Sequence, residues 1–265
     1  GWKPGKQEGA SLNPLALAAG LLGVALAIVG QLSLFTTALT GLSVPPVAAL
    51  GATAVGVLIA AMAFGRKHFV KAIFAMVLMA CFNALSHGTQ DFYSNFLRKQ
   101  MTFDVATASW IIAVGSIGAI CGGLTSGSLS QLIGRRRMIT IGALCVLPMV
   151  PMWVFYSTTP LMFAGAVFLL QFCVQGAWGV VPAHLNEISP GDVRGTFPGF
   201  TYQVGNLLSA GVAFGQTSLV VNQHWQYSQA LALAAVCAAV AIAVLINLGP
   251  EGRHVVMGDV KTQSG

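Results

Sequence analysis

One stretch of the chain, residues 83–91, carries the side chains best suited to chemistry. It contains Asn83, His87, Gln90 and Asp91 within an otherwise apolar segment of about residues 71–98. At the depth of a membrane a charged side chain costs on the order of 2.5–3.5 kcal/mol, so such residues usually face a cavity or a protein neighbour. Imidazole ordinarily titrates near pH 6.5, within about three units of a carboxylate, so the two can exchange protons. The stretch therefore predicts a binding or proton-coupling site.

The spacing of these polar residues places them on one face of a helix. Asn83, His87 and Asp91 follow one another at intervals of four residues, with Gln90 beside them. We expect His87 and Asp91 to couple protons, and Asn83, His87 and Gln90 to contact a substrate. Gly88 favours a local loosening of the helix. The alternative is that the stretch only joins helices by hydrogen bonds.

Two further polar stripes occur in apolar segments, at a depth similar to that of the first stretch. One contains Gln171 and Gln175, and the other contains Tyr202, Gln203 and Asn206. Amide and hydroxyl groups donate and accept hydrogen bonds without carrying charge, which suits a carboxylate or hydroxyl ligand. We therefore expect these residues to bind substrate. A stripe that only mediates helix contacts remains the alternative.

Two loops carry charged motifs that are candidates for a gate. Glu187 and Arg194 are predicted to pair with each other, and a pair that forms in only one conformation can bias a two-state equilibrium. The loop at Gly134 carries three adjacent arginines, which can also serve simply to anchor the topology. The candidate gate residues are Gly127, Gly134, Arg135 and Arg136 in the first loop, and Glu187 and Arg194 in the second.

The elements that must position these residues are membrane-spanning helices. The chain has 265 residues, 55% hydrophobic and 8% charged, whereas a soluble domain carries about 25% charged residues. Recurrent apolar runs of about 18 residues or more predict an all-α polytopic membrane protein with eight transmembrane helices. The predicted spans are 13–36, 44–64, 70–97, 104–132, 138–156, 160–184, 196–220 and 228–248.

The distribution of basic residues predicts the orientation. With eight spans both termini lie on one side, and most Lys and Arg residues then fall on that side, so we expect both termini to be cytoplasmic. This asymmetry accounts for the net charge of +6 without nucleic acid. We expect an integral protein of a bacterial inner membrane or a plasma membrane. The residues on the predicted inner side are Lys3, Lys6, Arg66, Lys67, Lys71, Arg135, Arg136, Arg137, Arg194, Arg253 and Lys261, against Arg98 and Lys99 outside.

The predicted organisation has four parts: a loop at 1–12, two helices at 13–64, a six-helix bundle at 65–248 and a cytoplasmic tail at 249–265. The chain does not begin with Met, and we expect it to be part of a longer protein. The five cysteines stand singly in apolar segments, without the spacing of a metal site. We expect neither a metal nor another cofactor. No activated nucleophile is evident, which disfavours an intramembrane enzyme.

Three motifs within about residues 70–220 are specific enough to compare with a known family: Asn83-x-x-Ser86-His87-Gly88-x-Gln90-Asp91, Gln175-Gly176-Ala177-Trp178 and Tyr202-Gln203-x-Gly205-Asn206. They resemble the sialate:proton symporter family, which includes Jen-type lactate/pyruvate transporters and bacterial sialic acid transporters. Where the family pattern continues with Pro-Thr, this chain has Ser94-Asn95. Two loop motifs, Gly127-x-Leu129-x-x-x-x-Gly134-Arg135-Arg136 and Glu187-x-x-Pro190-x-x-x-Arg194-Gly195, resemble those of the major facilitator superfamily, to which that family belongs, with Gln131 in place of the usual loop acid.

The resemblance implies the C-terminal half of a major-facilitator carrier, preceded by two extra central helices. It implies alternating access and symport of a proton with a small carboxylate such as lactate or pyruvate, or with sialic acid. The partners would be the substrate, protons, the lipid bilayer and an N-terminal half that completes the binding site. A membrane scaffold without transport remains the alternative of another class, although a scaffold does not need polar stripes at mid-depth.

Overall fold

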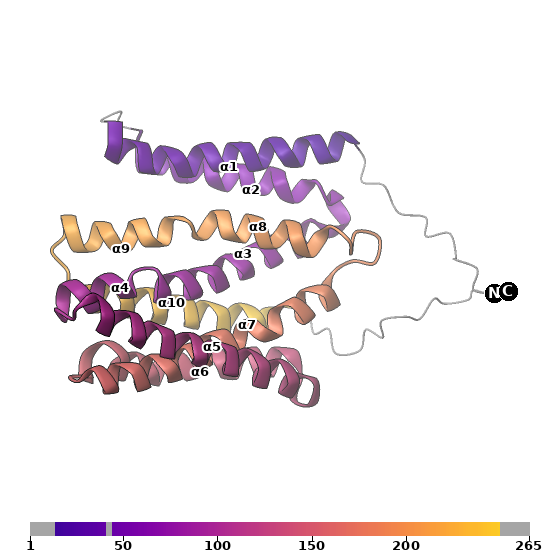
Figure 1. Cartoon of the computed structure of the whole chain (residues 1–265). Coiled ribbons are helices and arrows are strands. Elements are labelled where there is room, and N and C mark those ends of the chain that lie inside the picture. The colour runs from indigo at the N-terminus through magenta and orange to yellow at the C-terminus, as the bar shows by residue number, and fades with distance from the viewer. Residues whose placement is uncertain (1–13, 41–43, 250–265) are drawn as a thin grey trace.

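The computed structural model describes residues 14–40 and 44–249, and within these ranges all regular structure is helical (Figure 1). Seven helical segments of this part are long and apolar enough to cross a membrane. The all-α polytopic fold is thus confirmed, while the predicted loop 1–12 and the tail beyond Gly249 lie outside the described residues. The helices are α1 (Pro14–Thr40), α2 (Pro46–Met62), α3 (Gly65–Gln90), α4 (Tyr93–Asn95), α5 (Val105–Ile133), α6 (Arg135–Pro151), α7 (Pro160–Ile188), α8 (Phe197–Ser209), α9 (Gly211–Asn222) and α10 (Tyr227–Leu248), with π-helical turns η1 (Phe96–Gln100) and η2 (Met152–Tyr156).

Each of the eight predicted spans corresponds to helical structure, with three differences. The predicted span 44–64 is the shorter helix α2, whose 17 residues reach about 25 Å, less than the about 30 Å of a hydrocarbon core. The predicted span 196–220 is divided at Ala210 into α8 and α9. The third span is longer than expected, because α3, α4 and η1 together form one apolar segment.

Helix α3 lies at the centre of the polar site and packs against α2, α7, α8, α9 and α10. The α1–α2 hairpin runs along one edge of the molecule, next to α8 and α3 (Figure 1). Helices α5 and α7 approach each other closely at Gly118 and Gly122, where a Cβ atom would collide with the α7 backbone. The polar stretch of α3 is consequently bordered by α7 on one side and by α8 and α9 on the other.

Candidate functional site

The polar stretch occupies the last turns of α3 and the turn that follows. The helix passes through Gly88, ends at Gln90 and turns at Asp91 before α4 begins. The predicted loosening of the helix at Gly88 is therefore wrong, because the helix continues through this residue. Gly88 is tightly packed, since a Cβ there would lie 3.1 Å from the Cβ of Ala234 on α10, and this packing outweighs the weak helix propensity of glycine.

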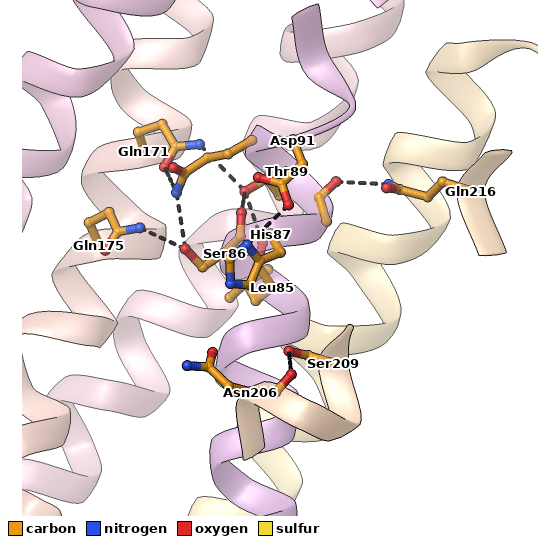
Figure 2. A network of polar contacts seen from close by, with 12 residues as sticks. Leu85, Ser86, His87, Thr89, Asp91, Gln171, Gln175, Asn206, Ser209 and Gln216 are labelled. Carbon is orange, nitrogen blue, oxygen red and sulfur yellow. Dashed lines mark hydrogen bonds and ion pairs between the residues drawn. The ribbon is translucent and has the colours of Figure 1, made fainter. Parts of the chain in front are cut away.

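His87 and Asp91 form the titratable part of the site (Figure 2). Their Nδ1 and Oδ2 atoms are 3.0 Å apart, and about half of each side chain is exposed (49% and 50%). With Asn206 and Ser209 they line a cavity of about 360 Å³ between α3, α8 and α9. Both side chains are therefore accessible from this cavity.

Three glutamines and two hydroxyl groups form a hydrogen-bonded cluster between α3 and α7 (Figure 2). The Nε2 atoms of Gln175 and Gln90 both donate to Ser86 Oγ at 3.0 Å. The buried Gln171 accepts a hydrogen bond from Gln90 and donates one to Thr89 Oγ1, and the donor–acceptor distance in each is 3.4 Å. Thr89, Gln90 and Gln171 line a second cavity of about 190 Å³ with residues of α5 and α7. We call this group the amide cluster; it offers hydrogen-bond donors without charge.

The remaining predicted binding residues, Asn83 on α3 and three residues of α8, lie outside the amide cluster. Asn83 is buried (2% exposed), and its Nδ2 atom has no hydrogen-bond partner among the described residues. It does not share the exposure of the titratable pair, because the helices packed around α3 cover it. On α8, Asn206 Nδ2 donates to Gln203 Oε1 at 3.3 Å. The ring of Tyr202 lies 5.8 Å from that of Trp178, in a separate cavity between α7 and α8.

The ion pair at the predicted gate differs from the one expected from the sequence. Glu187 was expected to pair with Arg194, whereas its Oε1 atom accepts from Arg135 Nε at 3.0 Å. Arg135 begins α6, which packs along α7, so its guanidinium reaches the last turn of α7 and also donates to Ser130. Both charged side chains are largely buried (18% and 12% exposed). Gly134 permits the sharp connection between α5 and α6 with a positive φ of 105°.

Further contacts at the same end join distant elements. Arg136 donates to the backbone carbonyl of Asn247 on α10, and Gly127 faces the backbone of α7 with room for an ordinary Cβ contact. His68 Nε2 lies 2.9 Å from Asp192 Oδ2, which connects the start of α3 to the loop after α7. This hydrogen bond lowers the pKa of Asp192 below its ordinary value. These contacts fix the loop end of the bundle.

Three polar residues of the site were assigned no role from the sequence: Ser86, which was named only within a motif, Thr89 and Gln216. Gln216 is buried (3% exposed), and its Nε2 atom donates to the carbonyl of Gly88 at 2.8 Å (Figure 2). It lies seven residues after Ser209 in the predicted span 196–220. Extending the polar stripe that contains Asn206 along this span would therefore have found it. Within the part of the chain that the structure describes, no group of three or more His, Cys, Asp or Glu side chains could hold a metal ion.

Comparison with known proteins agrees with this architecture. The 35% identical carboxylic acid transporter protein homolog of Saccharomyces cerevisiae aligns over 158 residues, 58% of this chain and 25% of that protein. A probable 4-methylmuconolactone transporter of Cupriavidus pinatubonensis is 25% identical over 199 residues, 74% of this chain and 45% of the relative. The chain thus spans between a quarter and a half of the length of these two relatives. The family model of the Major Facilitator Superfamily matches residues 76–258, more than half of the chain, and the chain therefore belongs to the major facilitator superfamily.

Proposed function

We propose that this chain is part of a secondary active transporter that carries a small carboxylate with a proton across a membrane by alternating access. The observation that carries the proposal is the position of the His87–Asp91 pair and the amide cluster on two sides of one membrane-spanning helix. Intramembrane ionisable groups of this kind mark solute and proton pathways. A scaffold would not need them, and the family and the named relatives support transport.

The amide cluster supplies the substrate contacts in this proposal. The donors of Gln90 and Gln175 both end on the neutral hydroxyl of Ser86, and the Gln90–Gln171 and Gln171–Thr89 bonds are long at 3.4 Å. A carboxylate is a stronger acceptor than a hydroxyl, so these donors can turn to a bound anion. The similarity to a yeast protein named carboxylic acid transporter homolog favours a carboxylate such as lactate or pyruvate.

The titratable pair supplies the coupling. A protonated His87 beside ionised Asp91 is a compensated pair, and the approach of an anionic substrate changes its balance. The proton is taken up from one side of the membrane and released when the cavity opens to the other. A second helical half completes the cavity, which agrees with the shorter length of this chain relative to its relatives.

The Arg135–Glu187 pair controls access from the inner side, where the predicted topology places the basic loops. An ion pair that forms only with the inner ends closed stabilises that conformation over the other, and its rupture accompanies opening. Both termini of the chain are then cytoplasmic.

The test uses the complete protein in proteoliposomes, with counterflow of lactate, pyruvate and sialic acid measured with and without a pH gradient. We expect saturable exchange of lactate or pyruvate, and accumulation that requires an inward proton gradient. Exchange of sialic acid alone would mean that sialic acid is the substrate in place of lactate or pyruvate, and the proposed symport mechanism would stand. Accumulation without any effect of the gradient would refute the symport, and absence of exchange for all three solutes would refute carboxylate transport.

A further inference from the structure

Gln216 on α9 makes a buried contact with the backbone of α3. Its Nε2 atom donates to the Gly88 carbonyl at 2.8 Å, and the side chain is 3% exposed (Figure 2). Gly88 is one of the last four residues of α3, whose carbonyls lack a partner within the helix. A side chain from another helix therefore satisfies a carbonyl that the end of α3 leaves open.

The other end of the same amide shows that the donor is what matters. Gln216 Oε1 is buried and has no hydrogen-bond partner among the described residues. A buried, unpaired amide oxygen is unfavourable, and an apolar side chain of the same shape would avoid it. Packing alone therefore does not account for a glutamine here, whereas the bond to Gly88 does.

The carbonyl that Gln216 holds lies between the two titratable residues of the site. Gly88 follows His87 directly, and three residues later the chain turns at Asp91. The helix end fixes where the Asp91 carboxylate points, so the position of Gly88 controls the 3.0 Å contact between His87 Nδ1 and Asp91 Oδ2. On the other side, α9 begins just after the break at Ala210, which itself lines the cavity of the pair.

We propose that Gln216 is a positioning residue for proton coupling. It holds the end of α3 so that His87 and Asp91 stay in contact and face their cavity, and it transmits any movement of α9 about the break at Ala210 to that pair. This inference rests on the proposed function, in which the pair carries the coupled proton. Gln216 itself touches neither substrate nor proton.

The decisive variant is Gln216→Met in the complete protein, which keeps the length of the side chain and removes its donor. We expect gradient-driven uptake of lactate to fall about threefold to tenfold, the range for loss of one buried hydrogen bond, and the pH profile of uptake to move. Counterflow at equal pH on both sides should stay within about twofold, since it does not need net proton transfer. The matched control is Gln223→Met, the same exchange at an exposed position after α9.

A second variant guards against a folding defect. Gln216→Glu keeps the shape, and its carboxyl group donates to Gly88 only when protonated, so its uptake defect should deepen as pH rises. A wild-type pH profile in both variants would overturn the inference even if heat stability fell, because a purely structural role lowers the amount of folded protein without moving the profile. Lack of proton dependence in the wild type would instead refute the proposed function.

Discussion

Two histidines of α3, one near each end of the helix, each pair with an aspartate. The Nδ1–Oδ2 distance in His87–Asp91 is 3.0 Å, and the Nε2–Oδ2 distance in His68–Asp192 is 2.9 Å. Their settings differ. The first joins two half-exposed residues four positions apart on the chain, while the second joins a nearly buried histidine to an aspartate 124 residues away. Residue types and distance alone therefore do not separate a coupling site from a structural tether.

The difference lies in what each pair connects. Breaking His87–Asp91 separates no elements, since both residues belong to the same end of α3. Breaking His68–Asp192 releases the start of α3 from the loop between α7 and α8. The first pair opens into a cavity that is also lined by the polar side chains of Asn206 and Ser209. We therefore expect the two pairs to respond oppositely to substitution.

The largest effect is expected from Asp91→Asn. This change removes the titratable carboxyl group and keeps its size, so gradient-driven uptake should fall at least about tenfold, in line with the loss of a group that carries charge in the cycle. Counterflow at equal pH should persist. Uptake by the variant in proteoliposomes, with and without a pH gradient, measures both quantities.

The control for that change is Asp104→Asn, the same exchange at the N-cap of α5. Asp104 accepts from the backbone N–H of Ala106, and Asn is an equally good N-cap residue. Uptake by this control should match the wild type. Full gradient dependence in Asp91→Asn would remove the distinction between the two histidine–aspartate pairs.

A smaller effect of a different kind is expected from Gln175→Met. The variant loses the donor that now reaches Ser86 at 3.0 Å, and with it one contact to the substrate. KM should rise about fivefold to tenfold, as for a hydrogen bond worth about 1 to 1.4 kcal/mol, while the pH profile stays in place. A shifted profile would show that binding and coupling are not divided between the two sides of α3. Gln223→Met again serves as the surface control.

A third, still smaller effect concerns Glu187→Gln, which removes the ion pair with Arg135. A maleimide that reacts with Gly199→Cys reports opening at this end, because Gly199 lines the nearby cavity and has space for a side chain. Labelling should speed up about fivefold, as for an interaction of about 1 kcal/mol, and Arg194→Gln should change it less. An equal effect of Arg194→Gln would favour the pairing expected from sequence.

The ion-pair partner of Glu187 shows which features could not be predicted from the sequence. Apolar runs of membrane length have one ready solution, the helix, so the fold could be predicted. The contact of Asp91 with its histidine followed from a spacing of four. The partner of Glu187 did not follow from spacing, because the choice between Arg135 and Arg194 depends on how α6 packs along α7. The burial of Asn83 likewise depends on which helices surround α3.

The smallest effect is expected at the second histidine–aspartate pair, from Asp192→Asn. The hydrogen bond from His68 lowers the pKa of Asp192 in the folded protein, so its contribution to stability is present above about pH 4, the ordinary value of an aspartate. It is lost as the pH falls through the lowered value. Because nearly half of the Asp192 side chain is exposed (46%), we expect at most about 1 kcal/mol.

Thermal unfolding of wild type and Asp192→Asn in detergent, at several pH values, measures this contribution. The variant should melt at a lower temperature near pH 7, and the gap should close as the pH falls below about 4, while the pH profile of uptake stays that of the wild type. A shift of the uptake profile with no change in melting temperature would mean that proton coupling takes place at His68–Asp192 and not at His87–Asp91. The two pairs, each with its histidine on α3, thus serve as controls for each other.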